Sequence, residues 1–123
     1  MGIPASASAW MFNRLLAGLF VAHSVGIVHG AIVPCNLLIN TELHNGRIID
    51  WCYSAKAGSK IKAIVPKYKV FYPKEVFNKT SSFAVDISMA ARSIKWLLMG
   101  NQKTPPQING FLDYCIFFFL FHI

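Results

Sequence analysis

Acidic residues are scarce in this sequence. Its 123 residues contain five Asp or Glu against twelve Lys or Arg, which gives a formal net charge of +7. The hydrophobic fraction is 54%. A chain this apolar can bury a core, so the composition excludes an acidic tail and a disordered linker. At this length we expect one small globular domain rather than two.

Cysteine is also sparse. The sequence has only Cys35, Cys52 and Cys115, and it contains no Cys-x-x-Cys pair. An odd number of cysteines without that spacing predicts neither a disulfide framework nor a zinc site. Because free thiols are typical of a reducing compartment, we expect a cytoplasmic protein.

Apolar runs long enough to cross a membrane are missing. Residues 15–22 follow Arg14 like the core of a signal peptide, but they lie deep in the chain and no small-residue cleavage pattern follows them. Residues 111–123 are strongly apolar, yet Asp113 interrupts them and they fall short of the ~20 residues that a spanning helix needs. We therefore expect no membrane span.

The positive charge is concentrated in one segment. Seven lysines lie between Lys56 and Lys79, where Glu75 is the only acidic residue. Tyr68, Phe71 and Tyr72 accompany them, and lysines interleaved with aromatic residues are typical of nucleic-acid surfaces. A solvated loop explains the same lysines more simply, so we do not expect nucleic-acid binding.

Apolar spacing predicts two helices. The first carries one apolar face, with Ser6 or Ser8 as N-cap and Gly26 as its end. The second begins at Ser81 or Ser82 and ends at Gly100. The apolar positions of the two faces are Phe12, Leu15, Leu16, Leu19 and His23 in the first helix, and Ile87, Ala90, Ala91, Ile94, Leu97 and Leu98 in the second.

The remaining segments predict strands and loops. Residues 26–34 mix glycine, proline and β-branched residues, which favours an irregular loop. Two apolar runs, 37–39 and 47–49, are joined through Asn45-Gly46, a dipeptide typical of hairpin turns. Residues 51–80 predict a long loop, and the prolines at 105 and 106 precede a last short apolar segment.

Residues 29–36 carry a more specific pattern. They read His-Gly-Ala-Ile-Val-Pro-Cys-Asn, which resembles the H-R-D-L-x-x-x-N catalytic loop of protein kinases. Asp50-Trp51-Cys52 occupies the D-F-G position after the hairpin, and Pro73-Lys74-Glu75 resembles the A-P-E motif through its Glu. Residues 86–100, which begin with Asp and end in Leu-Leu-Met-Gly, are similar to the large central helix of the kinase C-lobe.

The order and spacing of these matches resemble the C-terminal lobe of a Ser/Thr protein kinase. The resemblance covers residues 5–115 and leaves 116–123 as an apolar tail outside it. It implies an α+β, mainly helical fold, namely a partial protein-kinase-like C-lobe with a small β-hairpin beside the catalytic loop.

The resemblance also implies that the catalytic groups are missing. Ala31 and Val33 occupy the positions of the catalytic Asp and Lys, and Gly30 that of the Arg. Phosphoryl transfer needs a residue that orients the acceptor hydroxyl and cations for the developing charge. We therefore expect a catalytically inactive, pseudokinase-like chain.

Five residues of these motifs match metal-binding or structural positions of the kinase pattern. Asn36 and Asp50 match the two Mg²⁺-binding positions, although Asn36 could instead cap the loop and Asp50 accept backbone hydrogen bonds. His29, Glu75 and Asp86 match structural positions. The resemblance implies that His29 packs in the core, that Asp86 hydrogen-bonds the backbone of the catalytic loop, and that the Arg partner of Glu75 lies beyond this sequence.

Two alternatives remain open. The sequence contains no Gly-rich loop and no V-A-I-K strand, so we expect no tight binding of Mg-ATP to this chain and a protein partner such as an N-lobe. In the first alternative, the chain is part of a longer, weakly active ATP-dependent Ser/Thr kinase that binds Mg-ATP through Asn36 and Asp50. In the second, the lysine segment makes it a basic protein-interaction module.

Overall fold

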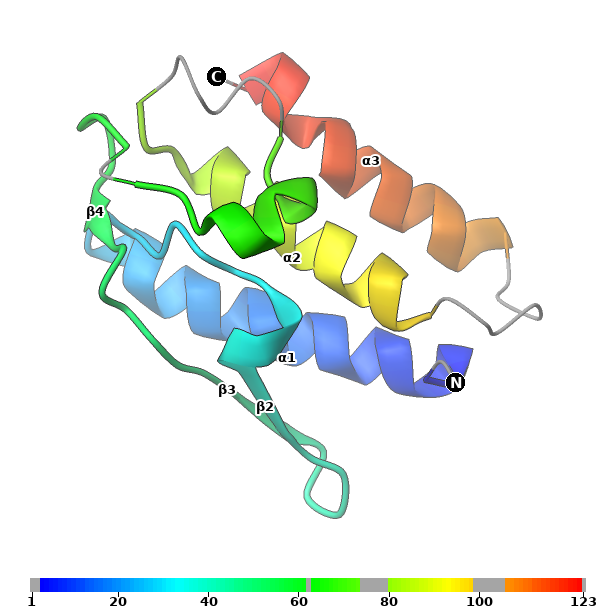
Figure 1. Cartoon of the computed structure of the whole chain (residues 1–123). Coiled ribbons are helices and arrows are strands. Elements are labelled where there is room, and N and C mark those ends of the chain that lie inside the picture. Colours follow the sequence, from blue (N-terminus) through cyan, green and yellow to red (C-terminus); the bar gives the residue numbers. More distant parts are fainter. Residues whose placement is uncertain (1–2, 62, 74–79, 99–105, 123) are drawn as a thin grey trace.

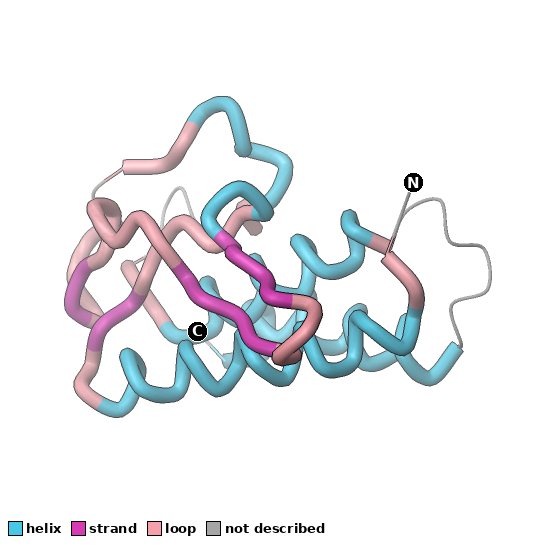
Figure 2. Tube along the Cα trace, turned by 90° about the horizontal axis from the view of Figure 1, so that it is seen from below, coloured by secondary structure: helices cyan, strands magenta, loops and turns pink. Residues whose placement is uncertain are grey.

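In the part of the chain that the structure describes, three α-helices and two small antiparallel sheets form the fold. The computed structural model describes residues 3–61, 63–73, 80–98 and 106–122, with side chains as far as Ile116. Helix α2 (Phe83–Leu97) lies between α1 (Ala5–Ser24) and α3 (Pro106–His122) (Figure 1). The strands lie together beside α1 (Figure 2). The expected α+β, mainly helical class is confirmed.

Helix α1 forms where the apolar spacing predicts it. Its buried residues recur every three or four positions, which places them on one face. The helix starts after Pro4, whose backbone is extended, and no side chain caps it. The predicted caps are wrong, because both serines lie inside the helix and the Ser8 hydroxyl donates to the Ala5 carbonyl at 2.6 Å. Gly26 follows the helix with φ +79°, a conformation that glycine adopts without strain.

The predicted hairpin is present, with a different turn. Strand β2 (Leu37–Asn40) pairs with β3 (Asn45–Ile48), and residue 40 faces residue 45. The turn is therefore 41–44, and the expected Asn45-Gly46 turn is wrong. The cause is Asn40, whose side-chain oxygen accepts hydrogen bonds from the backbone N–H groups of residues 42 and 43, both at 3.1 Å.

The segment expected to be one long loop contains regular structure. Strand β4 (Ala55–Lys56) pairs with β1 (Ile27–Val28), which lies in the segment expected to be irregular. A 3₁₀ helix, η2 (Pro66–Phe71), follows, and a second one, η1 (Pro34–Asn36), precedes the hairpin. Strands of two residues are too short for any periodicity to reveal them.

Helix α2 forms the centre of the core. Met89, Ala90, Ala91 and Ile94 are completely buried on it. Of the two predicted N-caps, Ser81 and Ser82, the structure has Ser82. The Ser82 hydroxyl makes no capping hydrogen bond. The predicted end at Gly100 lies outside the described residues.

Helix α3 is longer than the expected short segment. It crosses the boundary between residues 115 and 116, and Leu112, Cys115 and Ile116 all lie in the core. The Ser88 hydroxyl donates to the Ile116 carbonyl at 2.8 Å, which fixes α3 against α2. Within the described residues, no helix combines the length and apolar character needed to span a bilayer.

The core predicts how the chain responds to truncated side chains. Leu15 is 1% exposed in the core, whereas Leu43 is 69% exposed in the hairpin turn. Replacing Leu15 by Ala should lower the free energy of unfolding by about 3 kcal/mol, because it removes buried methyl groups and leaves a cavity. The matched Leu43→Ala change should stay within about 0.5 kcal/mol. Urea unfolding followed by circular dichroism measures both, and equal losses would contradict this packing.

Candidate functional site

The loop 29–36 is held from α2 by a buried carboxylate. Asp86 is completely buried in the first turn of that helix. One of its oxygens accepts from the backbone N–H of His29 at 2.7 Å, and the other accepts from that of Gly30 at 2.9 Å. Because charged acceptors make stronger hydrogen bonds than neutral ones, this carboxylate fixes the start of the loop. The expected role of Asp86 agrees with these contacts.

A second helix contributes to the same carboxylate. The His23 ring of α1 lies with Nε2 2.9 Å from Asp86 Oδ2. The ring also stacks on Phe83, with the ring centroids 4.5 Å apart. Asp86 therefore connects α1, α2 and the loop, which the sequence did not reveal because His23 and Asp86 are 63 residues apart.

His29 links the loop to the end of the hairpin. Its Nδ1 lies 3.1 Å from the backbone nitrogen of Ala31, which can only donate, so Nδ1 accepts. Its Nε2 lies 2.9 Å from the Ile49 carbonyl, which can only accept, so Nε2 donates. One neutral tautomer satisfies both contacts. The ring is completely buried and meets Trp51 edge to face, with the ring centroids 4.5 Å apart.

No side chain with acid–base chemistry occupies the centre of the loop. Ala31, Ile32 and Val33 are completely buried. The Ile32 carbonyl accepts from the Ser93 hydroxyl of α2 at 3.1 Å. Ser93 lies two helical turns after Asp86, on the same face, and this spacing could have identified it from the sequence.

Asn36 is turned back onto the loop. It is 7% exposed, and its side-chain nitrogen donates to the Ala31 carbonyl at 3.0 Å. The Cys35 thiol contacts its side-chain oxygen at 3.7 Å. The Asn36 carbonyl accepts from the Ile49 backbone at 2.9 Å, so the β2–β3 ladder continues to the residue before Asp50. These contacts correspond to the alternative in which Asn36 stabilises the loop.

Asp50 lies on the surface in an unusual backbone conformation. Its φ is +59°, uncommon for a residue other than glycine, and its side chain is exposed. Its Oδ1 accepts from the Cys52 thiol at 2.8 Å. This hydrogen bond, followed by desolvation and the charge of the carboxylate, raises the pKa of Cys52.

Asn36 and Asp50 are the two residues matched to metal-binding positions. Mg²⁺ prefers near-octahedral oxygen coordination. Asn36 and Asp50 would supply at most two protein ligands, and the described residues hold no group of three His, Cys, Asp or Glu side chains that could bind a metal. A Mg²⁺ ion held by these two residues would therefore take most of its ligands from water or from substrate phosphates.

The segment after β4 closes over the loop. The Tyr72 hydroxyl donates to the Gly30 carbonyl at 3.0 Å and accepts from the Val65 backbone at 3.3 Å. Burial raises the pKa of Tyr72. Gly30 has φ +82°, and a Cβ built on it would lie 3.0 Å from the Tyr53 carbonyl oxygen, so this position requires glycine.

The remaining predicted features lie on the surface or outside the described residues. Glu75 belongs to 74–79, which the structure does not describe. Four lysines of the basic segment are exposed, and Lys67 Nζ lies 5.6 Å from the centroid of the Tyr68 ring. The exposed lysines are Lys56, Lys60, Lys67 and Lys69.

The burial of Asp86 predicts how its replacement changes the stability of the fold. Asp86→Asn should lower the free energy of unfolding by about 3 kcal/mol, because the new amide nitrogen would face backbone N–H donors that lose a charged acceptor. The matched Asp113→Asn change removes only a partly exposed ion pair with Lys95 and should cost about 1 kcal/mol or less. Chemical denaturation of both variants measures the difference, and a larger loss at Asp113 would refute this role for Asp86.

The contact between Asp50 and Cys52 predicts how the alkylation of Cys52 depends on pH. Because the carboxylate raises the pKa of Cys52, Asp50→Asn should lower that pKa and shift the pH profile of thiol alkylation toward lower pH. Alkylation by iodoacetamide, followed for each cysteine by peptide mass spectrometry, measures the profile. Cys35 serves as the internal control, and an unchanged Cys52 profile would contradict the hydrogen bond.

Comparisons with known proteins give this geometry no family. No protein-family model and no curated protein sequence matches the chain. The likeness to the kinase C-lobe therefore rests on the residues of this chain alone.

Proposed function

We propose that this chain is a protein-kinase-like C-lobe that does not transfer phosphate and that acts by binding a protein. The observation that carries the proposal is the loop 29–36. The positions matched to the catalytic Asp and Lys are Ala31 and Val33, and both are completely buried. Neither side chain can orient an acceptor hydroxyl or neutralise phosphate charge.

The internal hydrogen bonding of the loop supports the same proposal. His29 bonds to the loop and to the hairpin, and the Asn36 amide bonds to the Ala31 carbonyl. These polar groups already have partners within the chain. Their arrangement suits a structural scaffold better than a site that must exchange substrate and product.

A protein partner is supported by exposed apolar side chains near the end of α1. Phe20, Val21 and Val25 are 72%, 67% and 74% exposed. Apolar side chains gathered on a surface often mark contacts with other proteins. In this proposal they contribute to the surface that receives the partner, such as an N-lobe.

Two alternatives rank lower. In a longer kinase, Asn36 and Asp50 would contact the metal ions that accompany ATP, but the Asn36 amide already stabilises the loop. A basic interaction module rests on the exposure of the lysines, which solvation alone also explains.

A phosphotransfer assay tests the proposal. The purified chain, incubated with Mg²⁺, γ-labelled ATP and a basic acceptor protein, should transfer no more label than its Asp50→Ala variant, because the loop offers no group to orient the acceptor. Asp113→Ala is the matched control for loss of a carboxylate elsewhere. Transfer that Asp50→Ala abolishes and Asp113→Ala preserves would overturn the proposal and favour the longer-kinase alternative.

A further inference from the structure

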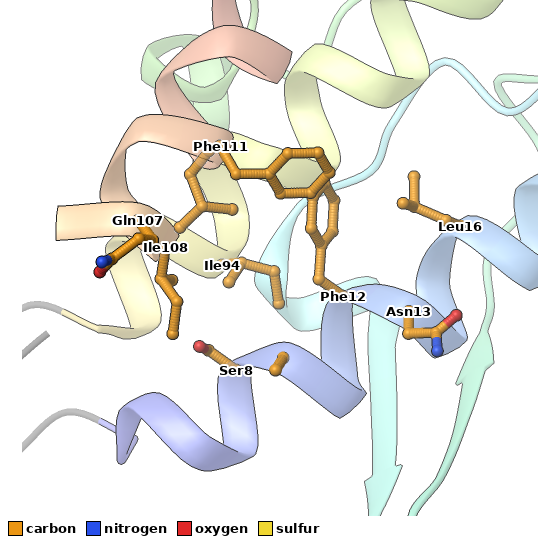
Figure 3. A pocket seen from close by; sticks show the side chains of 10 residues that line it. Ser8, Phe12, Asn13, Leu16, Ile94, Gln107, Ile108 and Phe111 are labelled. Atoms are coloured by element: carbon orange, nitrogen blue, oxygen red, sulfur yellow. The ribbon is translucent and has the colours of Figure 1, made fainter. Parts of the chain in front are cut away.

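A cavity of about 370 Å³ opens between the three helices, and the loop 29–36 contributes no residue to it (Figure 3). Each helix contributes a buried apolar side chain to its lining, namely Phe12 of α1, Ile94 of α2 and Leu112 of α3. The volume lies in the range of roughly 300–1,000 Å³ that is usual for small-molecule sites. The cavity is therefore large enough for a small ligand.

Apolar side chains form the walls. Leu16, Ile108 and Phe111 add further apolar side chains to the lining. Phe111 meets Phe12 edge to face, with the ring centroids 5.7 Å apart, which gives one wall a defined shape.

The polar groups at the cavity are neutral. Asn13 and Gln107 are exposed and lie on opposite sides of the opening (Figure 3). The Ser8 hydroxyl already donates to the Ala5 carbonyl. No lining residue carries a charge.

We propose that this cavity binds the hydrocarbon chain of an uncharged, single-chain amphiphile. The apolar walls take the chain, and the amides of Asn13 and Gln107 offer hydrogen bonds to a hydroxyl or carbonyl group at the opening. A carboxylate or phosphate head group would lose part of its hydration at the opening without meeting a cation in the lining, so charge disfavours fatty acids and phospholipids. This inference does not depend on the proposed lack of phosphotransfer.

Ligand chemistry provides the first test. Octanol, hexanol and octanoate are titrated into the unmodified chain at neutral pH, and binding is followed by nuclear magnetic resonance of the methyl groups of Ile94, Ile108 and Leu112. Octanol should bind saturably. Each buried methylene contributes roughly fourfold in affinity, so hexanol should bind about 15-fold more weakly. Octanoate should bind at least about tenfold more weakly than octanol, because its charge stays uncompensated.

A matched pair of variants locates the site. Ala9 lines the cavity and Ala17 does not, and both are exposed alanines of α1. Ala9→Phe should fill the cavity and weaken octanol binding at least about tenfold, whereas Ala17→Phe should leave it unchanged. The urea midpoint of each variant shows whether it is folded, and the titrations of the unmodified chain stand without them.

Four results would overturn the proposal. They are an absence of saturation with octanol, equal binding of octanoate, equal effects of the two variants, and a dimer in sedimentation that Ala9→Phe dissociates. The last result would show that a second copy of the chain covers the cavity.

Discussion

A single buried carboxylate connects the parts of this fold. Asp86 lies in the central helix, accepts from the backbone of loop 29–36 and contacts His23 of α1. Burying a charge is costly unless donors replace its lost water, and here two backbone N–H groups and a ring nitrogen do so. Because these donors come from separate elements, the same compensation also positions the elements relative to one another.

The loop beside this carboxylate uses its polar groups to hold itself in place. The His29 ring accepts a hydrogen bond from the Ala31 backbone and donates one to the Ile49 carbonyl. The Asn36 amide donates to the Ala31 carbonyl. The Ser93 and Tyr72 hydroxyls donate to two further loop carbonyls, those of Ile32 and Gly30. A loop with so many hydrogen bonds to itself and to its surroundings needs no ligand to order it.

The elements with strong local patterns could be predicted from the sequence. Helices α1 and α2 show apolar spacing over several turns, and the hairpin runs are separated by polar residues. The turn was mispredicted because Asn40, rather than Asn45-Gly46, directs the backbone. Strands β1 and β4 were missed because each has two residues, and their pairing joins distant segments. The full length of α3 was missed because its sequence is apolar on nearly every side, which leaves no period to follow.

The candidate site also combines residues that the sequence identifies with contacts that it does not reveal. The loop, Asp50 and Asp86 stand out as motif positions, whereas the contacts of His23 and Tyr72 join residues 63 and 42 positions apart. No local pattern contains such pairings, since they depend on how the helices pack. Ser93 is intermediate, because its spacing from Asp86 places both on one helix face.

Gly30 and Ala31 limit the substitutions that this loop tolerates. A side chain at Gly30 would press against the Tyr53 carbonyl and would need a backbone conformation that favours glycine. Beside it, Ala31 occupies a fully enclosed position with no room for an unpaired charge. A side chain at position 30, or a charged group at position 31, would therefore require the backbone around the loop to rearrange.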